Sequence, residues 1–322
     1  MLTSTGWLTP LGHGVHCIDT GYQRPQLAAA YLVVDAGEAA FIDTGTARSA
    51  ERLLAALEHL GLERRAVRWI CPTHVHLDHA GGAGVLLQEL PQARLVVHPR
   101  GARHLVDPGR LEAGVRSVYG DAEFERLFGR IVPAPAARVV EAGDGLELPL
   151  GKRVLGFVDT PGHARHHYSV WDPASRGFFT GDSFGLAYPE VCCADRPFVF
   201  PTTTPVQFDP EAWDQTLDRY LARRPERMYL THFGMVGQVP ALAADLRRRI
   251  AAVAELARGL PRAERSISAL RGKLAEYLAT ELESCGLGAQ ALEAALRTFA
   301  MDLDLNAQGL QVWLQRLDAQ AP

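Results

Sequence analysis

A short segment near residue 75 carries four side chains that can bind a metal ion. In the string Thr73-His74-Val75-His76-Leu77-Asp78-His79, three imidazoles and one carboxylate occupy six consecutive positions. Imidazole nitrogens and carboxylate oxygens bind borderline divalent ions such as zinc at about 2.0 to 2.2 Å. Because packing does not account for so many polar groups at this spacing, we interpret the segment as a metal-binding loop.

Three more candidate ligands follow at isolated positions, each just after a segment with the composition of a strand. They are His163, Asp182 and His232, which follow residues 154–158, 178–180 and 228–230 in that order. The histidine-rich string likewise follows a strand-like segment, residues 67–71. Turns at strand ends let side chains converge from different directions, so these positions are candidates for one site.

The elements that must position these side chains alternate between strand and helix patterns. Runs rich in β-branched and aromatic residues predict strands at 16–18, 31–34, 40–42, 67–71, 94–98, 139–140, 146–148, 154–158, 168–171, 178–180 and 228–230. Apolar residues at helical spacing predict helices at 47–60, 80–90 and 209–223. Two sets of strands with flanking helices predict an α/β (α+β) fold with two packed sheets between helical layers.

The residue composition of the sequence changes beyond Pro240. Segments rich in Ala, Leu, Arg and Glu run to the end, with breaks near 259–261 and 286–288. We therefore expect a catalytic domain over residues 1–240 and a helical C-terminal extension over residues 241–322. The apolar face of the extension has to be buried over the metal cleft or against a second subunit, and we favour packing beside the site, which is also compatible with a homodimer. The aperiodic, proline-containing segment 183–205 is interpreted as a substrate-facing loop.

The composition narrows the function classes. The chain has 322 residues, of which 47% are hydrophobic and 22% charged, as in a globular enzyme with a large core. A net charge of −4 disfavours nucleic acid as a partner. Neither a signal peptide nor an apolar stretch long enough to cross a bilayer is evident, so we expect a cytoplasmic protein that acts on a small molecule. The five cysteines are irregularly spaced and are expected to be reduced thiols.

The order of the ligand motifs resembles the metallo-β-lactamase superfamily, whose hallmark is the His-x-His-x-Asp-His string followed by isolated ligands downstream. Each downstream motif is present, namely Pro161-Gly162-His163, Thr180-Gly181-Asp182 and Thr231-His232-Phe233-Gly234. The resemblance covers residues 14 to 240 and implies a four-layer αββα sandwich. Within it, the segments 162–169 and 202–205 are most similar to a branch of uncharacterised archaeal and bacterial hydrolases.

This resemblance implies two divalent metal ions. The implied ligands are His74, His76 and His163 for one ion, Asp78, His79 and His232 for the other, and Asp182 as the bridge. Zinc is the favoured metal, and iron or manganese accepts the same ligand types. The resemblance also implies that Asp43 supports the metal-binding loop without contacting the ions itself.

The implied reaction is hydrolysis of a small-molecule ester, lactone or thioester, with a metal-bridging hydroxide as the nucleophile. Asp78 and Asp182 are the candidate catalytic residues, because their carboxylates neutralise part of the metal charge and can shuttle a proton. The segment 178–183 is similar to that of thioester-cleaving relatives such as glyoxalase II. The spacing from His79 to His163 is longer than in glyoxalase II, which argues against specificity for glutathione thioesters.

A non-haem iron oxidoreductase on the same fold is the alternative. Persulfide dioxygenases keep the same ligand string and use a single iron, so the ligands alone do not separate the two activities. Flavodiiron proteins usually have glutamate where this sequence has His76, which disfavours a flavodiiron activity. A nuclease is disfavoured by the acidic balance, and a metal-free binding module would be expected to have lost ligands.

Three weaker candidates complete the set. His167 begins a strand close to a ligand and is a candidate contact for a ligand or for the substrate. Tyr188 lies in the predicted substrate-facing loop, where its phenol can hydrogen-bond a developing oxyanion. Gly81, Gly82 and Gly84 lack the ending of a phosphate-binding loop and are expected to allow close helix packing beside the site.

Overall fold

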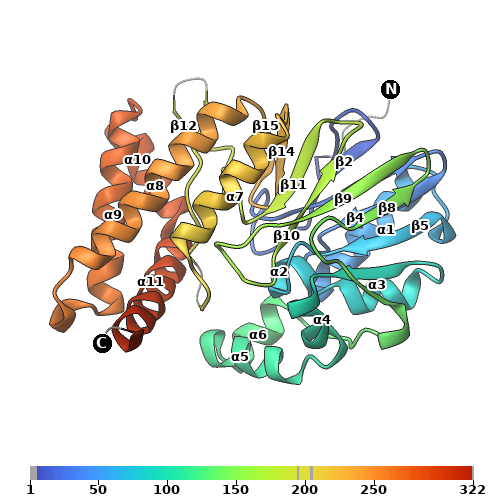
Figure 1. Ribbon diagram of the computed structural model, residues 1–322, viewed down its shortest axis with the longest axis horizontal. Helices are drawn as coiled ribbons and strands as arrows, with labels where there is room; N and C mark the ends of the chain where they lie inside the picture. The colour runs from blue at the N-terminus through green and yellow to red at the C-terminus, as the bar shows by residue number, and fades with distance from the viewer. Residues whose placement is uncertain (1–5, 194–195, 204–205, 321–322) are drawn as a thin grey trace. The chain divides into compact units, whose positions relative to one another are not determined.

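The computed structural model describes residues 6–193, 196–203 and 206–320, which form two compact units (Figure 1). Unit 1 comprises residues 1–160, 166–181 and 224–237, and unit 2 comprises residues 161–165, 182–223 and 238–322. The C-terminal helices thus share a unit with segments from the middle of the chain. A division into domains at residue 240 stays a prediction. Thr204 and Pro205, which belong to one of the resembling segments, lie outside the described residues.

Unit 1 contains a seven-stranded sheet, here called sheet A. Its strands follow the order of the sequence: β1 (Leu8–Pro10), β2 (Val15–Asp19), β3 (Ala29–Asp35), β4 (Glu38–Ile42), β5 (Val67–Cys71), β6 (Arg94–Val97) and β7 (Val139–Glu141). The first four strands pair antiparallel, and β4 to β7 pair parallel. Parallel pairing places the carboxyl ends of β4 and β5 at the same edge of the sheet. Asp43 directly follows β4, and the histidine-rich string follows β5.

A second, six-stranded sheet of unit 1 is here called sheet B. In spatial order its strands are β15 (Gly234–Val236), β14 (Arg227–Leu230), β11 (Gly177–Gly181), β10 (Tyr168–Asp172), β9 (Arg153–Asp159) and β8 (Glu147–Leu150). Only β11 and β14 pair parallel among them, so the segments that follow these two strands leave the sheet at one edge. Those segments contain the predicted ligands Asp182 and His232.

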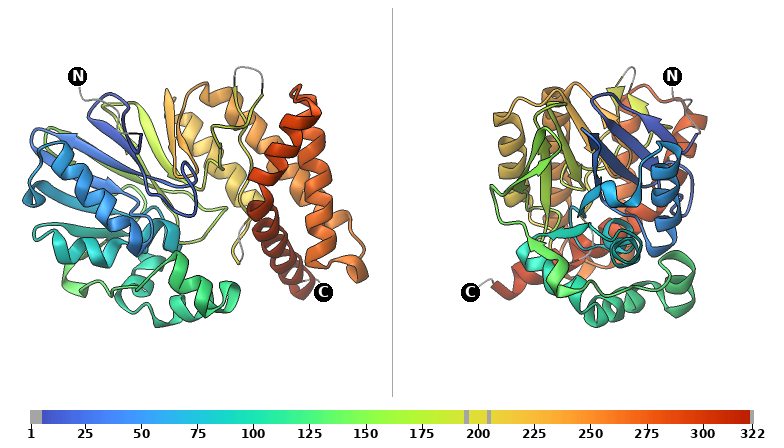
Figure 2. Two further views of the ribbon diagram at one scale, coloured as in Figure 1. Left: turned by 180° about the vertical axis from the view of Figure 1, so that it is seen from behind. Right: turned by 90° about the vertical axis from the view of Figure 1, so that its right-hand side faces the viewer.

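Two apolar layers hold unit 1 together. Aromatic residues of both sheets, among them Tyr31, Phe157 and Phe179, form the core between the sheets. The right-hand view of Figure 2 shows the two sheets side by side. On the other face of sheet A, Phe41 and Ile70 pack under the helices α1 (Ala50–His59) and α3 (Ala83–Glu89). Each fully buried side chain of this size contributes about 1.5 to 3 kcal/mol. The predicted α/β class with two packed sheets is therefore confirmed.

The remaining helices of unit 1 are short and follow β5, β6 and one another. They are α2 (Leu77–Ala80), α4 (Pro99–Val106), α5 (Gly109–Tyr119) and α6 (Asp121–Leu127). Helix α4 begins with proline at its first turn, and the His98 side chain accepts a hydrogen bond from the main-chain N–H of Arg100 at its N-cap. The segment between β6 and β7 therefore contains three consecutive helices, α4, α5 and α6.

Close packing explains the glycines that follow the histidine-rich string. A Cβ added to Gly84 would overlap the carbonyl oxygen of Val132, and one added to Gly82 would lie 2.9 Å from the carbonyl oxygens of Thr44 and Thr46. The predicted role of these glycines in close helix packing is therefore confirmed.

Gly84→Ala should lower the free energy of unfolding by about 1 to 3 kcal/mol, since helix α3 would have to move away from Val132. The matched control is Gly114→Ala in helix α5, where nothing lies within 4 Å of the added Cβ. That variant should be neutral or more stable by up to about 1 kcal/mol, because alanine favours helix. Urea unfolding of both variants checks the prediction, and equal stabilities would contradict it.

Unit 2 is mainly helical. Its strands β12 (Cys192–Cys193) and β13 (Arg196–Pro197) pair antiparallel. Its helices are α7 (Pro210–Ala222), α8 (Val239–Gly259), α9 (Ile267–Ser284), α10 (Ala289–Thr298) and α11 (Ala300–Gln320). The predicted helical C-terminal region is confirmed, with both breaks near the expected positions. Apolar residues of α9 and α11 such as Leu274 and Leu310 are fully buried within this unit, and a homodimer stays a prediction. Among the described residues, no helix is both long enough and apolar enough to cross a bilayer.

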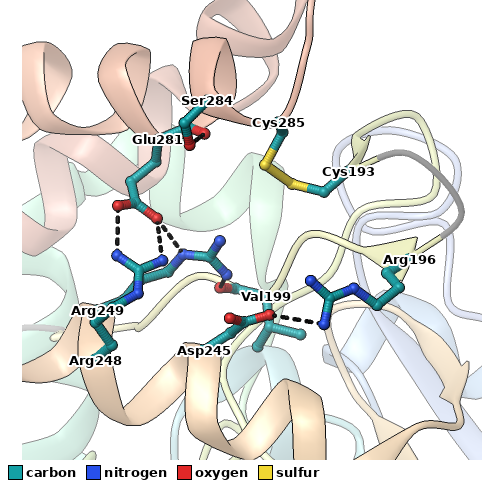
Figure 3. The surroundings of a disulfide bond; sticks show 9 residues. All are labelled: Cys193, Arg196, Val199, Asp245, Arg248, Arg249, Glu281, Ser284 and Cys285. Atoms are coloured by element: carbon teal, nitrogen blue, oxygen red, sulfur yellow. Dashed lines mark hydrogen bonds and ion pairs between the residues drawn. A yellow bond between two sulfur atoms is a disulfide. The ribbon is translucent and has the colours of Figure 1, made fainter.

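The cysteines correct one expectation from the sequence. Cys193 and Cys285, which are 92 residues apart, form a disulfide that joins β12 to the end of α9 (Figure 3). Folding of unit 2 brings the two segments together, which their irregular spacing did not indicate. The expectation of reduced thiols therefore holds only for Cys17, Cys71 and Cys192.

An ion-pair cluster joins α8 to α9 beside this disulfide. The Glu281 carboxylate accepts hydrogen bonds from Arg248 at 2.6 Å and from Arg249 at 2.9 Å (Figure 3). Hydrogen bonds from Arg248, followed by those from Arg249, outweigh burial and lower the pKa of Glu281 from 4.5 to about 2.

Because the folded protein has the lower pKa, the contribution of Glu281 to stability should be fully present above pH 4.5 and should be lost as the pH falls toward 2. Urea unfolding at pH 7 and at pH 3 measures this loss. In Glu281→Gln the same pH change should cost less stability than in the native protein. An identical pH dependence in the two proteins would contradict the assignment.

Candidate metal centre

Asp43 anchors the loop that follows β5. Its carboxylate is buried, and one oxygen accepts hydrogen bonds from the main-chain N–H of Thr73 at 2.6 Å and from the Thr73 hydroxyl at 2.9 Å. The other oxygen accepts from the Thr231 hydroxyl at 2.6 Å and from His79 Nδ1 at 2.9 Å. One side chain therefore connects the ends of β4, β5 and β14, and it fixes the histidine-rich string to the segment that carries His232.

Asp78, His79 and His232 form the first group of candidate ligands, and all three belong to unit 1. One potential ligand atom from each lies within 4.8 Å of the others. Asp78 Oδ2 is 3.4 Å from His232 Nε2 and 3.7 Å from His79 Nε2. The carboxylate and the two imidazoles thus face one another.

The hydrogen bonds behind these rings fix their tautomers. His79 Nδ1 faces the Asp43 carboxylate, and His232 Nδ1 lies 2.7 Å from the carbonyl oxygen of Leu27. Since carbonyl and carboxylate oxygens only accept, each Nδ1 carries the hydrogen and each Nε2 presents a lone pair. Two nitrogen lone pairs and one carboxylate at this separation fit a divalent cation.

His74 and His76 form a second group on the same loop. His74 Nε2 lies 2.8 Å from His76 Nδ1, and the Thr73 hydroxyl lies 3.2 Å from His74 Nδ1. Because that hydroxyl donates to Asp43, it accepts from His74 Nδ1, which leaves the His74 Nε2 lone pair directed at His76. The ring of His167 stacks on His74 with centroids 4.9 Å apart, and its Nδ1 hydrogen-bonds Thr160 at 2.8 Å. The weaker candidate His167 therefore touches a predicted ligand.

The predicted ligands His163 and Asp182 belong to unit 2, where they lie together. His163 Nε2 is 3.4 Å from Asp182 Oδ2, and both side chains are buried. The turn that carries His163 is held by α7, since the Thr216 hydroxyl donates to the Pro161 carbonyl at 2.6 Å. Gly162 has φ +132° and its backbone contacts Trp213 so closely that a side chain would not fit.

Two other side chains differ from expectation in what they contact. The Tyr188 hydroxyl was expected near a developing oxyanion, but it donates to the Asp302 carboxylate at 3.1 Å and the residue is buried. Thr202, which the sequence offered only as part of a resembling segment, lies against His163 Nδ1 with its carbonyl oxygen at 3.0 Å and its hydroxyl at 2.8 Å.

Tyr22 is a residue that the sequence analysis missed and whose phenol is subject to the charge of Asp78. Burial, with the Asp78 carboxylate as the next cause, raises the pKa of Tyr22, so its phenol stays neutral. Its ring packs 5.9 Å from that of Phe128, which in turn lies 5.3 Å from Tyr119. Tyr22 stands in a turn without strand or helix periodicity, and a single aromatic residue there carries no recognisable signal.

Comparisons with known proteins identify the relatives of this chain. Residues 24–232 match the family model of the Metallo-beta-lactamase superfamily. The metallo-beta-lactamase fold-containing protein ST1585 of Sulfurisphaera tokodaii is 29% identical over 228 residues, which cover 69% of this chain and 79% of that protein. A hydroxyacylglutathione hydrolase of Hahella chejuensis is 29% identical over 196 residues, which cover 61% of this chain and 56% of the relative.

A solved structure shows the same fold. The metallo-beta-lactamase family protein TTHA1429 from Thermus thermophilus superimposes with a TM-score of 0.66 and 22% identity, and the match covers 96% of each chain.

Proposed function

Because the chain belongs to the metallo-β-lactamase superfamily, we propose that it is a dinuclear metal-dependent hydrolase of a small-molecule ester, lactone or thioester. The observation that carries this proposal is the group of Asp78, His79 and His232, whose donor atoms lie within 4.8 Å of one another. Each imidazole of the group is held by a protein acceptor behind it, so that Nε2 is available to a cation. Held in this way, the ligands are oriented before a metal binds.

We assign the ligands as the family pattern does. His74, His76 and His163 would hold one ion, Asp78, His79 and His232 the other, and Asp182 would bridge them. Zinc is the metal we favour, and iron and manganese are the alternatives. When bound, two such ions lower the pKa of a coordinated water toward neutrality and polarise a substrate carbonyl.

The side chains of the chain itself supply charge balance and proton transfer. Asp78 and Asp182 offset part of the positive charge of the ions. The Asp78 side chain is 24% exposed, whereas that of Asp182 is 6% exposed. The Asp78 carboxylate is therefore better placed than that of Asp182 to exchange a proton with solvent and to deliver it to the leaving group.

We favour an apolar or aromatic acyl group in the substrate, because Tyr22, on which the Asp78 carboxylate acts electrostatically, belongs to an aromatic cluster. The Tyr22 phenol is neutral, and with Phe128 and Tyr119 it forms an aromatic cluster. The name of the Hahella chejuensis relative, a hydroxyacylglutathione hydrolase, supports a thioester among the candidate substrates.

Activity assays on substrate panels test the proposal. Protein loaded separately with zinc, manganese or iron is assayed on lactones, aryl esters, acyl thioesters and an aryl phosphodiester. We expect hydrolysis of at least one carbonyl substrate and little turnover of the phosphodiester. Iron-dependent oxygen consumption with a persulfide, without hydrolysis, would replace the proposal by the oxidoreductase alternative.

A further inference from the structure

The loop between Asp182 and α7 is tied to the C-terminal helices at several points within unit 2. Arg249 donates to the Val199 carbonyl at 2.8 Å, and Tyr188 donates to Asp302. The Cys193–Cys285 disulfide fixes the tip of the loop to the end of α9, as Figure 3 shows. The C-terminal helices thus determine the conformation of a loop that also contains Thr202.

Asn306 of helix α11 contacts the residues on either side of Thr202. Its side-chain Nδ2 donates to the Pro201 carbonyl at 2.9 Å, and its Oδ1 accepts from the main-chain N–H of Thr203 at 2.7 Å. The Thr203 hydroxyl donates to the Asn306 main-chain carbonyl at 2.9 Å. Asn306 and Thr203 are both buried. We call these three hydrogen bonds the Asn306 clamp, and they bracket Thr202 from both sides.

The side chain at 306 has to be an amide for this arrangement. It donates to the carbonyl of Pro201 and accepts from the main-chain N–H of Thr203. A carboxylate lacks the donor, and an alkyl side chain lacks both functions. Because the groups are buried, each unmade hydrogen bond would leave a polar atom without water to replace its partner.

Thr202, held by the clamp, in turn contacts His163. Its carbonyl oxygen lies 3.0 Å from His163 Nδ1, and a carbonyl only accepts. Nδ1 therefore carries the hydrogen, and the lone pair is on Nε2, which faces Asp182 Oδ2 at 3.4 Å. The Thr202 hydroxyl lies 2.8 Å from the same Nδ1 and accepts from it as well, so the two oxygens of Thr202 together set the tautomer and the orientation of the ring.

We propose that Asn306 is a positioning residue for His163: the clamp fixes Thr202, and Thr202 holds the His163 ring so that Nε2 is available to a metal ion. The proposal rests on the proposed function only in taking His163 as a ligand. It assigns to the C-terminal helix α11 a part in building the metal centre, although α11 contributes no ligand.

The test compares Asn306→Ala with Gln311→Ala in the zinc-loaded protein. Gln311 is the matched control, because it is also an amide of α11 that donates to a main-chain carbonyl, that of Arg265 at 3.0 Å. Zinc affinity is measured by competition with a chromophoric chelator, and the His163 Nδ1–H signal is followed by ¹⁵N-edited NMR. In Asn306→Ala we expect zinc affinity to fall about 10- to 100-fold and the ring N–H to exchange faster with solvent. Gln311→Ala should change neither.

Thr203→Val keeps the proposal testable if Asn306→Ala does not fold. It removes one hydrogen bond of the clamp and preserves the shape of the side chain, so the same changes should appear at smaller size. Unchanged zinc affinity and an unchanged ring signal in the variant that folds would overturn the proposal. If the native protein binds neither zinc nor iron nor manganese, the proposed function fails, while the His163 ring signal still decides whether the clamp positions the imidazole.

Discussion

Asp78→Ala should lower the rate of hydrolysis by about 10³-fold and reduce the metal content from about two equivalents to about one. The Asp78 carboxylate faces His79 Nε2 and His232 Nε2, and alanine offers neither a ligand atom nor negative charge in that position. Because the side chain is partly exposed and is not part of the core, the fold should tolerate the change. The thermal unfolding temperature measured after chelation should therefore stay close to that of the native protein.

Asp121→Ala is the matched control for this effect. Asp121 is also an aspartate of unit 1, and its side chain is 86% exposed and pairs with Arg116. This variant should keep full activity and full metal content, since an exposed ion pair contributes at most about 1 kcal/mol. If Asp78→Ala were as active and as metal-rich as the control, Asp78 would be neither a ligand nor a proton carrier.

Asp43→Ala should lower the free energy of unfolding by about 3 to 5 kcal/mol, even in the presence of a chelator. The substitution leaves the Thr73 N–H, the Thr231 hydroxyl and the His79 Nδ1–H buried without their common acceptor. The cost is therefore structural and precedes any loss of metal. Urea unfolding of the metal-free protein measures it.

Asp43→Asn separates the loss of the acceptor from the loss of the side chain. The amide retains one oxygen that can accept and has nearly the same shape, so we expect a smaller loss of stability than in Asp43→Ala. Weaker zinc binding should accompany both substitutions, because the tautomer of His79 is no longer fixed. A stability of Asp43→Ala within about 1 kcal/mol of the native value would show that the carboxylate does not hold the loop.

The parts of this structure that the sequence predicted are those whose signal is local. Strand composition located β5, and the histidine-rich string follows it directly, so the candidate ligands could be recognised without knowing the topology. The C-terminal helices were visible from apolar spacing, and Gly259 and Gly286 mark their breaks. The close packing at Gly84 could be expected because three glycines follow the histidine-rich string without the ending of a phosphate-binding loop.

The features that the sequence did not predict depend on contacts between distant segments. The disulfide joins Cys193 to Cys285 across 92 residues, and nothing in the spacing of the cysteines distinguishes this pair. Asn306 reaches the segment around Thr202 across more than a hundred positions, and a single asparagine within a helix has no pattern of its own. Tyr188 was predicted to hydrogen-bond a developing oxyanion of the substrate, but its hydroxyl donates to Asp302 in the folded protein.

The central claim is that the chain is a dinuclear metal hydrolase, and metal content measured together with activity tests it most directly. Protein purified without added metal is analysed by mass spectrometry and assayed on the carbonyl substrates, alongside His76→Ala and Asp182→Ala. We predict about two equivalents of zinc, iron or manganese in the native protein and loss of hydrolysis in both variants. A single equivalent of iron, with oxygen consumption and no hydrolysis of any carbonyl substrate, would contradict the claim.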